Sequence, residues 1–214
     1  MSDIKYISFF GAIFASYLAG SIPTGYIVGR LMKGIDIRNF GSGNMGATNV
    51  VRVLGKGPGI LTLVIDMIKG LVAVLWIARL FNNDSGFSQS NFQLGCGIAA
   101  IGGHNWTCFL RFKGGKGVAT STGVFLGLAP YVTLCLVGLW CVSAYLTRYV
   151  SLSSIIASTA LPIFLWVFDK PIAWVAAGFL LSLISIWKHR SNIKRLLDGK
   201  ENKIGQKSEI SDDV

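Results

Sequence analysis

Three glycines in the segment FGSGNMGATNVVR (residues 40–52) have the G-x-G-x-x-G spacing of a dinucleotide-binding loop: Gly41, Gly43 and Gly46. That fingerprint functions only where a strand enters the loop and a helix leaves it, within a βαβ unit. The flanking residues 6–29 and 57–78 are instead long apolar runs, which excludes a strand on either side. We therefore expect a glycine-rich loop whose backbone N–H groups converge on an anion, because glycine tolerates the positive φ angles that this requires.

Side chains with hydrogen-bonding groups lie beside these glycines: Ser42, Asn44, Thr48 and Asn49. The Walker pattern G-x-x-x-x-G-K-[ST] nearly fits from Gly41, but Ala47 occupies the lysine position, which argues against an NTPase. Arg52 is then the nearest residue able to supply the missing positive charge. The alternative interpretation is a flexible glycine-rich linker between two membrane spans.

A second basic segment, FKGGKG (residues 112–117), places Lys113 and Lys116 around a Gly-Gly pair. Two such sites suggest two phosphorylated ligands, although lysines at the end of a span can also simply obey the positive-inside rule. His189 and Asn192 follow the last apolar run three residues apart, so they share one face if the helix continues, and both can bond hydroxyl groups.

His104 lies near the end of the third apolar run. It is either a buried histidine bonded to a backbone carbonyl or a catalytic or phosphate-orienting group. Asp66 and Lys69 are three residues apart in the second run and can form an ion pair along one helix face, which lowers the cost of placing charge in lipid. We favour this structural pairing over a proton path.

The composition indicates an integral membrane protein. Of 214 residues, 52% are hydrophobic and only 14% are charged, with a mean hydropathy of +0.56. A net charge of +10 could suggest nucleic acid, but in a membrane protein the positions of the cations matter more than their sum. We expect no nucleic-acid partner, no cofactor and no metal, and we interpret the four cysteines as packing residues.

Six apolar runs are visible, at residues 6–29, 57–78, 92–110, 117–147, 149–168 and 171–187. The fourth would form a helix of roughly 46 Å, longer than a hydrocarbon core of about 30 Å, and it contains Pro130. If it breaks near Leu128 to Tyr131, seven spans result and sixteen of the Lys and Arg residues lie on one side of the membrane, against three on the other. The sequence therefore predicts seven transmembrane helices, with the N-terminus outside and the C-terminus cytoplasmic. Residues 1–203 are predicted to form a single transmembrane domain, and residues 204–214 a flexible cytoplasmic tail.

Four segments together resemble one family: GSIPTGY (residues 20–26), DIRNFGSGNMGATNVVRVLGK (36–56), FKGGKGVAT (112–120) and HRSNIKRLLDGKENK (189–203). Their order and content are similar to the bacterial acyl-phosphate:glycerol-3-phosphate acyltransferases of the PlsY type. Two departures are visible. Thr107 stands where the family commonly has a proline, and Gly57 stands where a second lysine is frequent.

The resemblance implies transfer of a fatty acyl group from acyl phosphate to the sn-1 hydroxyl of glycerol 3-phosphate. The products would be lysophosphatidic acid and inorganic phosphate, in the first step of membrane phospholipid biosynthesis. It further implies a multi-pass protein of the bacterial inner (cytoplasmic) membrane, in contact with membrane lipid, with its active site facing the cytoplasm. An enzyme that produces acyl phosphate is a possible partner.

By the same resemblance, the acyl phosphate would be bound by Gly41, Ser42, Gly43, Asn44, Gly46, Thr48 and Asn49. Glycerol 3-phosphate would be surrounded by Ser42, Arg52, Lys113, Ser151, His189 and Asn192. Lys116 and His104 are second-tier candidates. No protein nucleophile or base is implied, because a phosphate oxygen of a substrate can take the hydroxyl proton.

Two other functions would use some of the same features. A transporter of a phosphorylated metabolite would also need cations and glycines near a membrane, but such proteins usually bind the ligand near the midplane between repeats. No repeat is visible here, and the charges expected at the midplane are Asp66 and Lys69. A CDP-alcohol phosphotransferase would require a D-x-x-D-G motif, which the sequence lacks.

Overall fold

The computed structural model describes residues 2–81 and 88–206, and every regular element in these ranges is a helix. Contacts divide the chain into two compact units, Met1–Val124 with Gly205–Val214, and Phe125–Ile204, which are described separately. The helices of the first unit are α1 (Ser2–Ser21), α2 (Thr24–Lys33), η1 (Ile37–Asn39), α3 (Ala47–Leu54), α4 (Lys56–Val72), η2 (Ala73–Ile77), α5 (Ala78–Phe81), α6 (Gln89–Asn105) and η3 (Cys108–Leu110). The boundary falls within α7 (Val118–Leu128), and the second unit contains α8 (Pro130–Thr147), α9 (Val150–Val167), α10 (Ile172–Lys188) and α11 (Arg190–Leu197).

Within the described residues, four segments are long and apolar enough to cross a membrane. They are Tyr6–Lys33, Lys56–Phe81, Pro130–Thr147 and Val150–Val167. A fifth candidate is the pair α10 and α11, which are bent by 58° at His189. The two other predicted spans correspond to helices of 17 residues (α6) and 11 residues (α7), so the count of seven stays a prediction.

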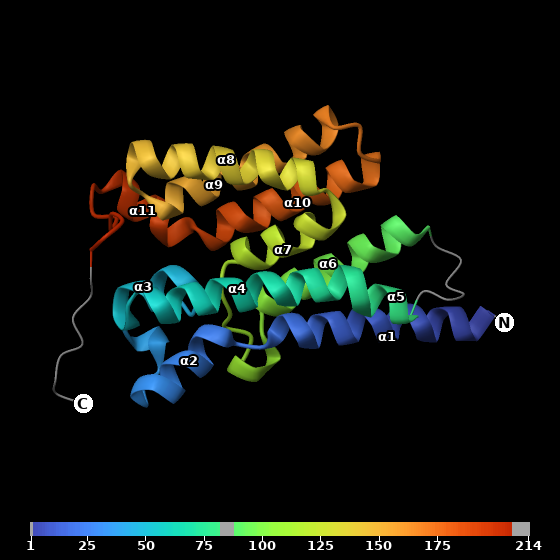
Figure 1. Ribbon diagram of the computed structural model, residues 1–214, viewed down its shortest axis with the longest axis horizontal. Helices are drawn as coiled ribbons and strands as arrows, with labels where there is room; N and C mark the ends of the chain where they lie inside the picture. The colour runs from blue at the N-terminus through green and yellow to red at the C-terminus, as the bar shows by residue number, and fades with distance from the viewer. Residues whose placement is uncertain (1, 82–87, 207–214) are drawn as a thin grey trace. The chain divides into compact units, whose positions relative to one another are not determined.

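In the first unit, α1 packs closely along α6 (Figure 1). Glycines make this approach possible. A Cβ atom at Gly20 would lie 2.0 Å from the carbonyl oxygen of Ala100, and one at Gly103 would lie 2.1 Å from that of Tyr17. Small residues at such crossings are typical of membrane helices, whose association depends on close van der Waals packing.

The first apolar run is not one helix, because α1 ends at Ser21 and α2 begins at Thr24. Pro23 lies in the break and has no N–H group to continue the helical ladder. Two side chains donate to the carbonyl groups that the break leaves without helical partners. Thr107 Oγ1 donates to Ser21 O at 2.5 Å, and Lys69 Nζ donates to Ile22 O at 3.0 Å. The side chain of Thr107 therefore satisfies a carbonyl group at the end of α1.

The helix that begins at Lys56 contains a π-helical turn, η2, between α4 and α5. Such a turn inserts one extra residue into the helix and disturbs the regular hydrogen bonds. Gln93 Nε2, on α6, donates to Val74 O within this turn at 2.9 Å. The buried residues through the turn are Lys69, Gly70, Ala73, Val74 and Ala78.

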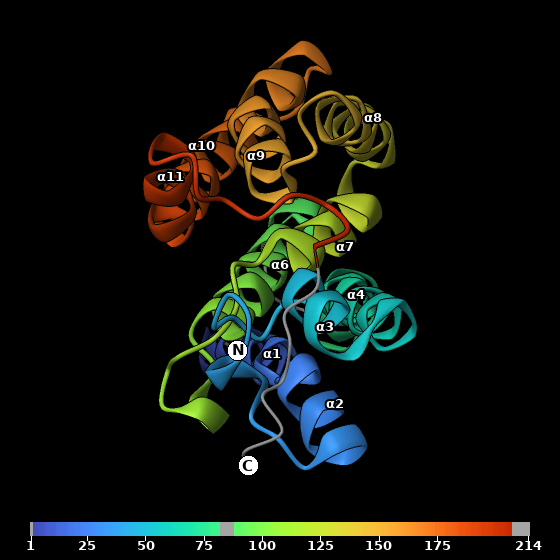
Figure 2. The same cartoon turned by 90° about the vertical axis from the view of Figure 1, so that its left-hand side faces the viewer.

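In the second unit, α9 packs against both α8 and α10, and α11 follows α10 after the bend (Figure 2). Polar side chains link these helices. Trp140 Nε1 donates to Ser154 Oγ at 3.1 Å, and the hydroxyls of Ser158 and Ser185 are 2.9 Å apart. The predicted interruption of the fourth apolar run is confirmed, since α7 ends at Leu128 and Pro130 opens α8. That residues 1–203 form a single domain stays a prediction.

Candidate functional site

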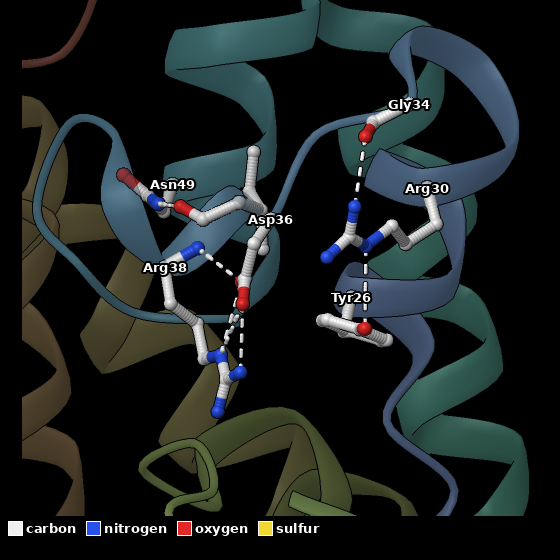
Figure 3. A network of polar contacts seen from close by, with 7 residues as sticks. Tyr26, Arg30, Gly34, Asp36, Arg38 and Asn49 are labelled. Carbon is white, nitrogen blue, oxygen red and sulfur yellow. Dashed lines mark hydrogen bonds and ion pairs between the residues drawn. The ribbon is translucent and has the colours of Figure 1, made fainter.

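The glycine-rich segment is a loop between η1 and α3, with Gly41 and Gly43 at φ angles of 60° and 71°. The buried side chain of Asn49 holds this loop together. Its Oδ1 accepts a hydrogen bond from Ser42 N at 2.7 Å, and its Nδ2 donates to Ile37 O and Phe40 O, each at 3.0 Å. Figure 3 shows Asn49 beside η1 in this arrangement. Asn49 thus connects the start of α3 to η1 and to the beginning of the loop.

The backbone N–H groups of this loop are used differently from the prediction. Ser42 N donates to Asn49 Oδ1, Gly43 N donates to Phe40 O at 3.1 Å, and Gly46 N donates to Asn44 Oδ1 at 2.9 Å. All three groups therefore have partners within the loop. The first N–H groups of a helix have no intrahelical partner, so the start of α3, at Ala47 and Thr48, is where this segment offers donors to an anion.

α3 is positioned by a small apolar core. Val50 and Met45 are buried together with Val28, Ile37 and Leu110. A Cβ atom at Gly25 on α2 would lie 1.9 Å from Met45 O, so only glycine permits this contact. On α3, Arg52 follows Thr48 by four residues, so both side chains lie on one face of the helix. Arg52 is 9% exposed.

A group of charged and aromatic side chains lies next to the loop, on α2 and η1 (Figure 3). The guanidinium carbons of Arg30 and Arg38 are 5.4 and 5.3 Å from the ring centroid of Tyr26. Arg30 also donates to the hydroxyl of Tyr26 at 3.2 Å and to Gly34 O at 2.9 Å. Sequence reasoning did not single out this group.

Asp36 neutralises one of these cations. Arg38 Nη2 donates to Asp36 Oδ2 at 2.7 Å, and Arg38 N donates to Asp36 Oδ1 at 3.0 Å. The side-chain hydrogen bonds from Arg38 hold the pKa of Asp36 below its usual value, against the opposing effect of burial, and the same pair raises the pKa of Arg38. Arg38 is therefore a fixed, compensated charge.

The second predicted loop, residues 112–117, is closed by backbone hydrogen bonds. Gly115 N donates to His104 O at 2.9 Å, Phe112 N to Thr107 O at 2.9 Å and Lys113 N to Leu110 O at 3.1 Å. Within this loop the side chain of Lys113 is exposed and that of Lys116 is half-buried. The loop thus holds two lysines immediately before α7, whose first N–H groups add further donors.

In the second unit, His189 lies at the bend between α10 and α11, and Asn192 lies on α11. The two helices are bent by 58° here, so the helix does not continue straight from α10 through His189 to Asn192. His189 Nδ1 is 2.8 Å from Ser185 O, and since a carbonyl oxygen can only accept, Nδ1 carries a proton. Both side chains are buried, at 2% and 3% exposure, and Ser151, at the start of α9, is buried too.

Glu201 joins two of these residues and was not anticipated from the sequence. Its Oε1 accepts hydrogen bonds from Ser151 Oγ at 2.9 Å and Asn192 Nδ2 at 2.8 Å, and its Oε2 accepts one from Arg195 Nε at 2.7 Å. Burial acts to raise the pKa of Glu201, but the three hydrogen bonds outweigh it and the pKa is lowered. The available signal was an acidic residue within a strongly basic segment, HRSNIKRLLDGKENK.

The structure thus brings the predicted residues together in groups. In the first unit, Ser42 is bonded to Asn49, and Thr48 and Arg52 share α3. Lys113 and Lys116 share the loop over His104. In the second unit, Ser151 and Asn192 are joined through Glu201, and His189 is three residues before Asn192.

The chain is similar to known proteins over most of its length. A family model described as "Glycerol-3-phosphate acyltransferase" matches residues 10–199. A glycerol-3-phosphate acyltransferase of Gloeobacter violaceus is 48% identical over 193 residues, covering 89% of this chain and 92% of that protein. One of Desulforamulus reducens is 45% identical over 195 residues, covering 91% and 94%.

Two solved structures are also similar to this chain. Both are of PlsY, described as an integral membrane glycerol 3-phosphate acyltransferase. The glycerol 3-phosphate form has a TM-score of 0.84 and 39% identity, and the lysophosphatidic acid form has a TM-score of 0.81 and 38% identity. Each comparison covers 92% of this chain and 96% of the other.

Proposed function

The chain belongs to the glycerol-3-phosphate acyltransferase family, and from this premise we propose that its acyl donor is an acyl phosphate. It is an integral membrane acyltransferase. The acceptor in the proposed reaction is the sn-1 hydroxyl of glycerol 3-phosphate, and the products are lysophosphatidic acid and inorganic phosphate. The observation that carries the proposal is the family match over residues 10–199, a range that includes every predicted site residue.

The proposed reaction needs no nucleophile from the protein. The glycerol hydroxyl oxygen attacks the acyl carbonyl carbon, the bond from that carbon to the phosphate oxygen breaks, and inorganic phosphate leaves. A phosphate oxygen of a substrate takes the hydroxyl proton. An acyl phosphate is a mixed anhydride with a stable leaving group, so the enzyme contributes mainly positioning and charge stabilisation.

For the acyl phosphate, we propose binding by the loop from Gly41 to Asn49. Since Ser42, Gly43 and Gly46 use their N–H groups within the loop, the start of α3 supplies the backbone donors and Thr48 adds a hydroxyl. Asn44 and Asn49 contribute by fixing the shape of the loop. Arg52, four residues after Thr48, supplies positive charge.

For glycerol 3-phosphate, we propose that Arg52 and Lys113 bind the phosphate group, with Lys116 as a secondary contact. Ser42, Ser151, His189 and Asn192 bind the rest of the molecule. Because Nδ1 of His189 donates to Ser185 O, Nε2 of a neutral His189 is an acceptor nitrogen, which is the chemistry that a glycerol hydroxyl can bond. Asn192 donates one amide proton to Glu201, and an amide group has both the donor and the acceptor that a glycerol hydroxyl can bond.

The topology is proposed on the distribution of charge. Seven transmembrane helices, with the N-terminus outside and the C-terminus cytoplasmic, place sixteen cations on the cytoplasmic side and three on the other. We assign the protein to the bacterial inner membrane with its site facing the cytoplasm. Residues 1–203 form the transmembrane domain and 204–214 the tail in this proposal. Tags at both termini should be accessible from opposite faces, and accessibility from the same face would refute it.

The donor is tested with purified protein in detergent. Palmitoyl phosphate and glycerol 3-phosphate should release inorganic phosphate and yield lysophosphatidic acid, whereas palmitoyl-CoA should not serve as donor. Use of the CoA ester but not of the acyl phosphate would overturn the proposal.

The site is tested with two variants. Lys113→Ala and Asn192→Ala should each abolish transfer, because each removes a proposed contact to glycerol 3-phosphate. Lys33→Ala, at an exposed lysine outside the site, is the matched control and should retain activity. Near-normal activity in both site variants would show that the site lies elsewhere.

A further inference from the structure

A buried polar cluster lies below the lysine-bearing loop of the first unit. It consists of Thr24 at the start of α2, Asp66 and Lys69 on α4, and His104 near the end of α6. None of these residues is more than 5% exposed. The ion pair predicted from the sequence is confirmed, with Lys69 Nζ 2.9 Å from Asp66 Oδ1, and Thr24 Oγ1 donates to the same oxygen at 2.9 Å.

Counting donors and acceptors around Lys69 determines where the proton of His104 lies. The ammonium group has three protons and no acceptor. Its neighbours are Asp66 Oδ1 at 2.9 Å, Ile22 O at 3.0 Å and His104 Nδ1 at 2.8 Å, one for each proton. A proton on Nδ1 would place a donor against a donor. Nδ1 therefore accepts, and the neutral imidazole carries its proton on Nε2.

The opposite edge of the same ring faces the loop at residues 112–117. A Cβ atom at Gly115 would lie 2.1 Å from His104 Nε2, and one at Gly114 would lie 2.1 Å from His104 O. Gly115 N donates to His104 O at 2.9 Å. The Gly-Gly pair thus passes directly over His104, and the two lysines stand on either side of that contact.

We propose that His104 is a positioning residue for the phosphate-binding loop. Lys69 holds the ring through Nδ1, and the Nε2 edge of the ring lies against the backbone at Gly115, in the loop that presents Lys113 and Lys116. This inference rests on the proposed function in one respect, namely that these lysines bind the phosphate of glycerol 3-phosphate. The cluster of Thr24, Asp66, Lys69 and His104 thereby connects a buried ion pair to the substrate loop.

The tautomer is tested on the unmodified protein. The chain has two histidines, so ¹⁵N-labelled imidazole groups in detergent micelles give two sets of signals. The set that disappears in His104→Asn belongs to His104. We expect a pyridine-type signal for Nδ1 and a pyrrole-type signal for Nε2. A pyrrole-type Nδ1, or two equivalent protonated nitrogens, would overturn the inference without reference to any activity.

Two substitutions separate the two edges of the ring. His104→Asn retains an acceptor near Nδ1 for Lys69 but removes the Nε2 edge of the ring. His104→Gln places an amide group near the position of Nε2 but removes the acceptor for Lys69. We expect the Asn variant to keep its melting temperature and to raise KM for glycerol 3-phosphate about tenfold with little change in kcat, because the loop loses the ring edge at Gly115 and the lysines are less well positioned. The Gln variant should melt at a lower temperature but keep KM within about threefold.

The pattern distinguishes positioning from general stability. If both variants lower kcat by loss of folded enzyme and leave KM unchanged, His104 is only structural and the proposal fails. If the Asn variant has a normal KM, the Nε2 edge of His104 does not position the loop and the proposal fails. Wild-type protein that fails to transfer from palmitoyl phosphate would instead contradict the proposed function, while the tautomer measurement would still decide the inference.

Discussion

Two side chains organise the two units, and they do so with different chemistry. In the first unit, Asn49 joins η1, the glycine-rich loop and α3 through one acceptor and two donors, all neutral. In the second unit, Glu201 joins α9, α11 and the segment after it by accepting three hydrogen bonds on a carboxylate. An amide satisfies carbonyl groups without charge, whereas a carboxylate collects donors and needs a cation nearby, here Arg195. The stability that Asn49 contributes to the first unit should therefore not depend on pH, whereas the stability that Glu201 contributes to the second unit should.

The largest effect is expected from Glu201→Ala. The substitution leaves the buried donors of Ser151 and Asn192 without an acceptor and removes the partner of Arg195, whose side chain is 31% exposed. We expect a loss of about 3 kcal/mol in the free energy of unfolding. The chain has six tryptophans, so intrinsic fluorescence during heating in detergent gives the melting temperature. An unchanged melting temperature would show that Glu201 does not hold these segments together.

Asn49→Ala should have the next largest effect. It leaves Ile37 O, Phe40 O and Ser42 N without this partner, and Asn49 is 1% exposed. We expect about 2 kcal/mol of destabilisation, because buried polar groups without partners cost more than the hydrogen bond itself contributed. Thermal unfolding checks this, with Asn39→Ala at an exposed asparagine of η1 as the control. Equal melting temperatures of the Asn49 variant and the control would show that Asn49 does not hold the loop together.

The pH dependence sharpens the contrast between the two side chains. Because the folded pKa of Glu201 is lowered, its contribution to stability is present above its ordinary value of 4.5 and is lost as the pH falls through the folded value. The difference in melting temperature between wild type and Glu201→Gln should therefore shrink as the pH falls below 4.5 and through the folded pKa of Glu201. The difference between wild type and Asn49→Ala should stay constant. A gap for Glu201→Gln that does not change with pH would contradict the charged role.

The smallest effect is expected at Asp36. Asp36→Asn keeps one side-chain oxygen to accept from Arg38 N but removes the charge that pairs with the Arg38 guanidinium. Both side chains are partly exposed, so we expect about 0.5 kcal/mol, which high salt should reduce further. Melting at low and high salt measures it. A loss as large as that for Asn49→Ala would mean that this surface pair organises the loop as much as Asn49 does.

The sequence was most informative where one residue type has one dominant physical effect. Proline at position 130 marked a real helix boundary, and the spacing of Asp66 and Lys69 marked a real ion pair. The break at Pro23 was missed because the apolar run continues through it, and hydropathy does not register a missing N–H group. The family and the enzyme class followed from the four motifs and agree with the comparisons.

Sequence reasoning could not determine which polar groups are already used inside the protein. Gly41, Gly43 and Gly46 carry the predicted spacing, yet the N–H groups of Gly43 and Gly46 are occupied by Phe40 O and Asn44 Oδ1. The N–H group of Ser42 between them is occupied by Asn49 Oδ1. Glu201 was missed for the related reason that its partner Ser151 lies fifty residues earlier. The sequence shows which donors and acceptors are present and how they are spaced, but only the fold shows which of them are paired.

The π-helical turn at Ala73–Ile77 affects how the second span must be mapped. One inserted residue rotates everything beyond it by about 100° relative to a regular helix. A helical wheel drawn without interruption from Lys56 to Phe81 therefore assigns the wrong side chains to the lipid after Val72. Cysteine-accessibility scanning along this span should show two regular patterns that differ in phase, with the change occurring inside the turn.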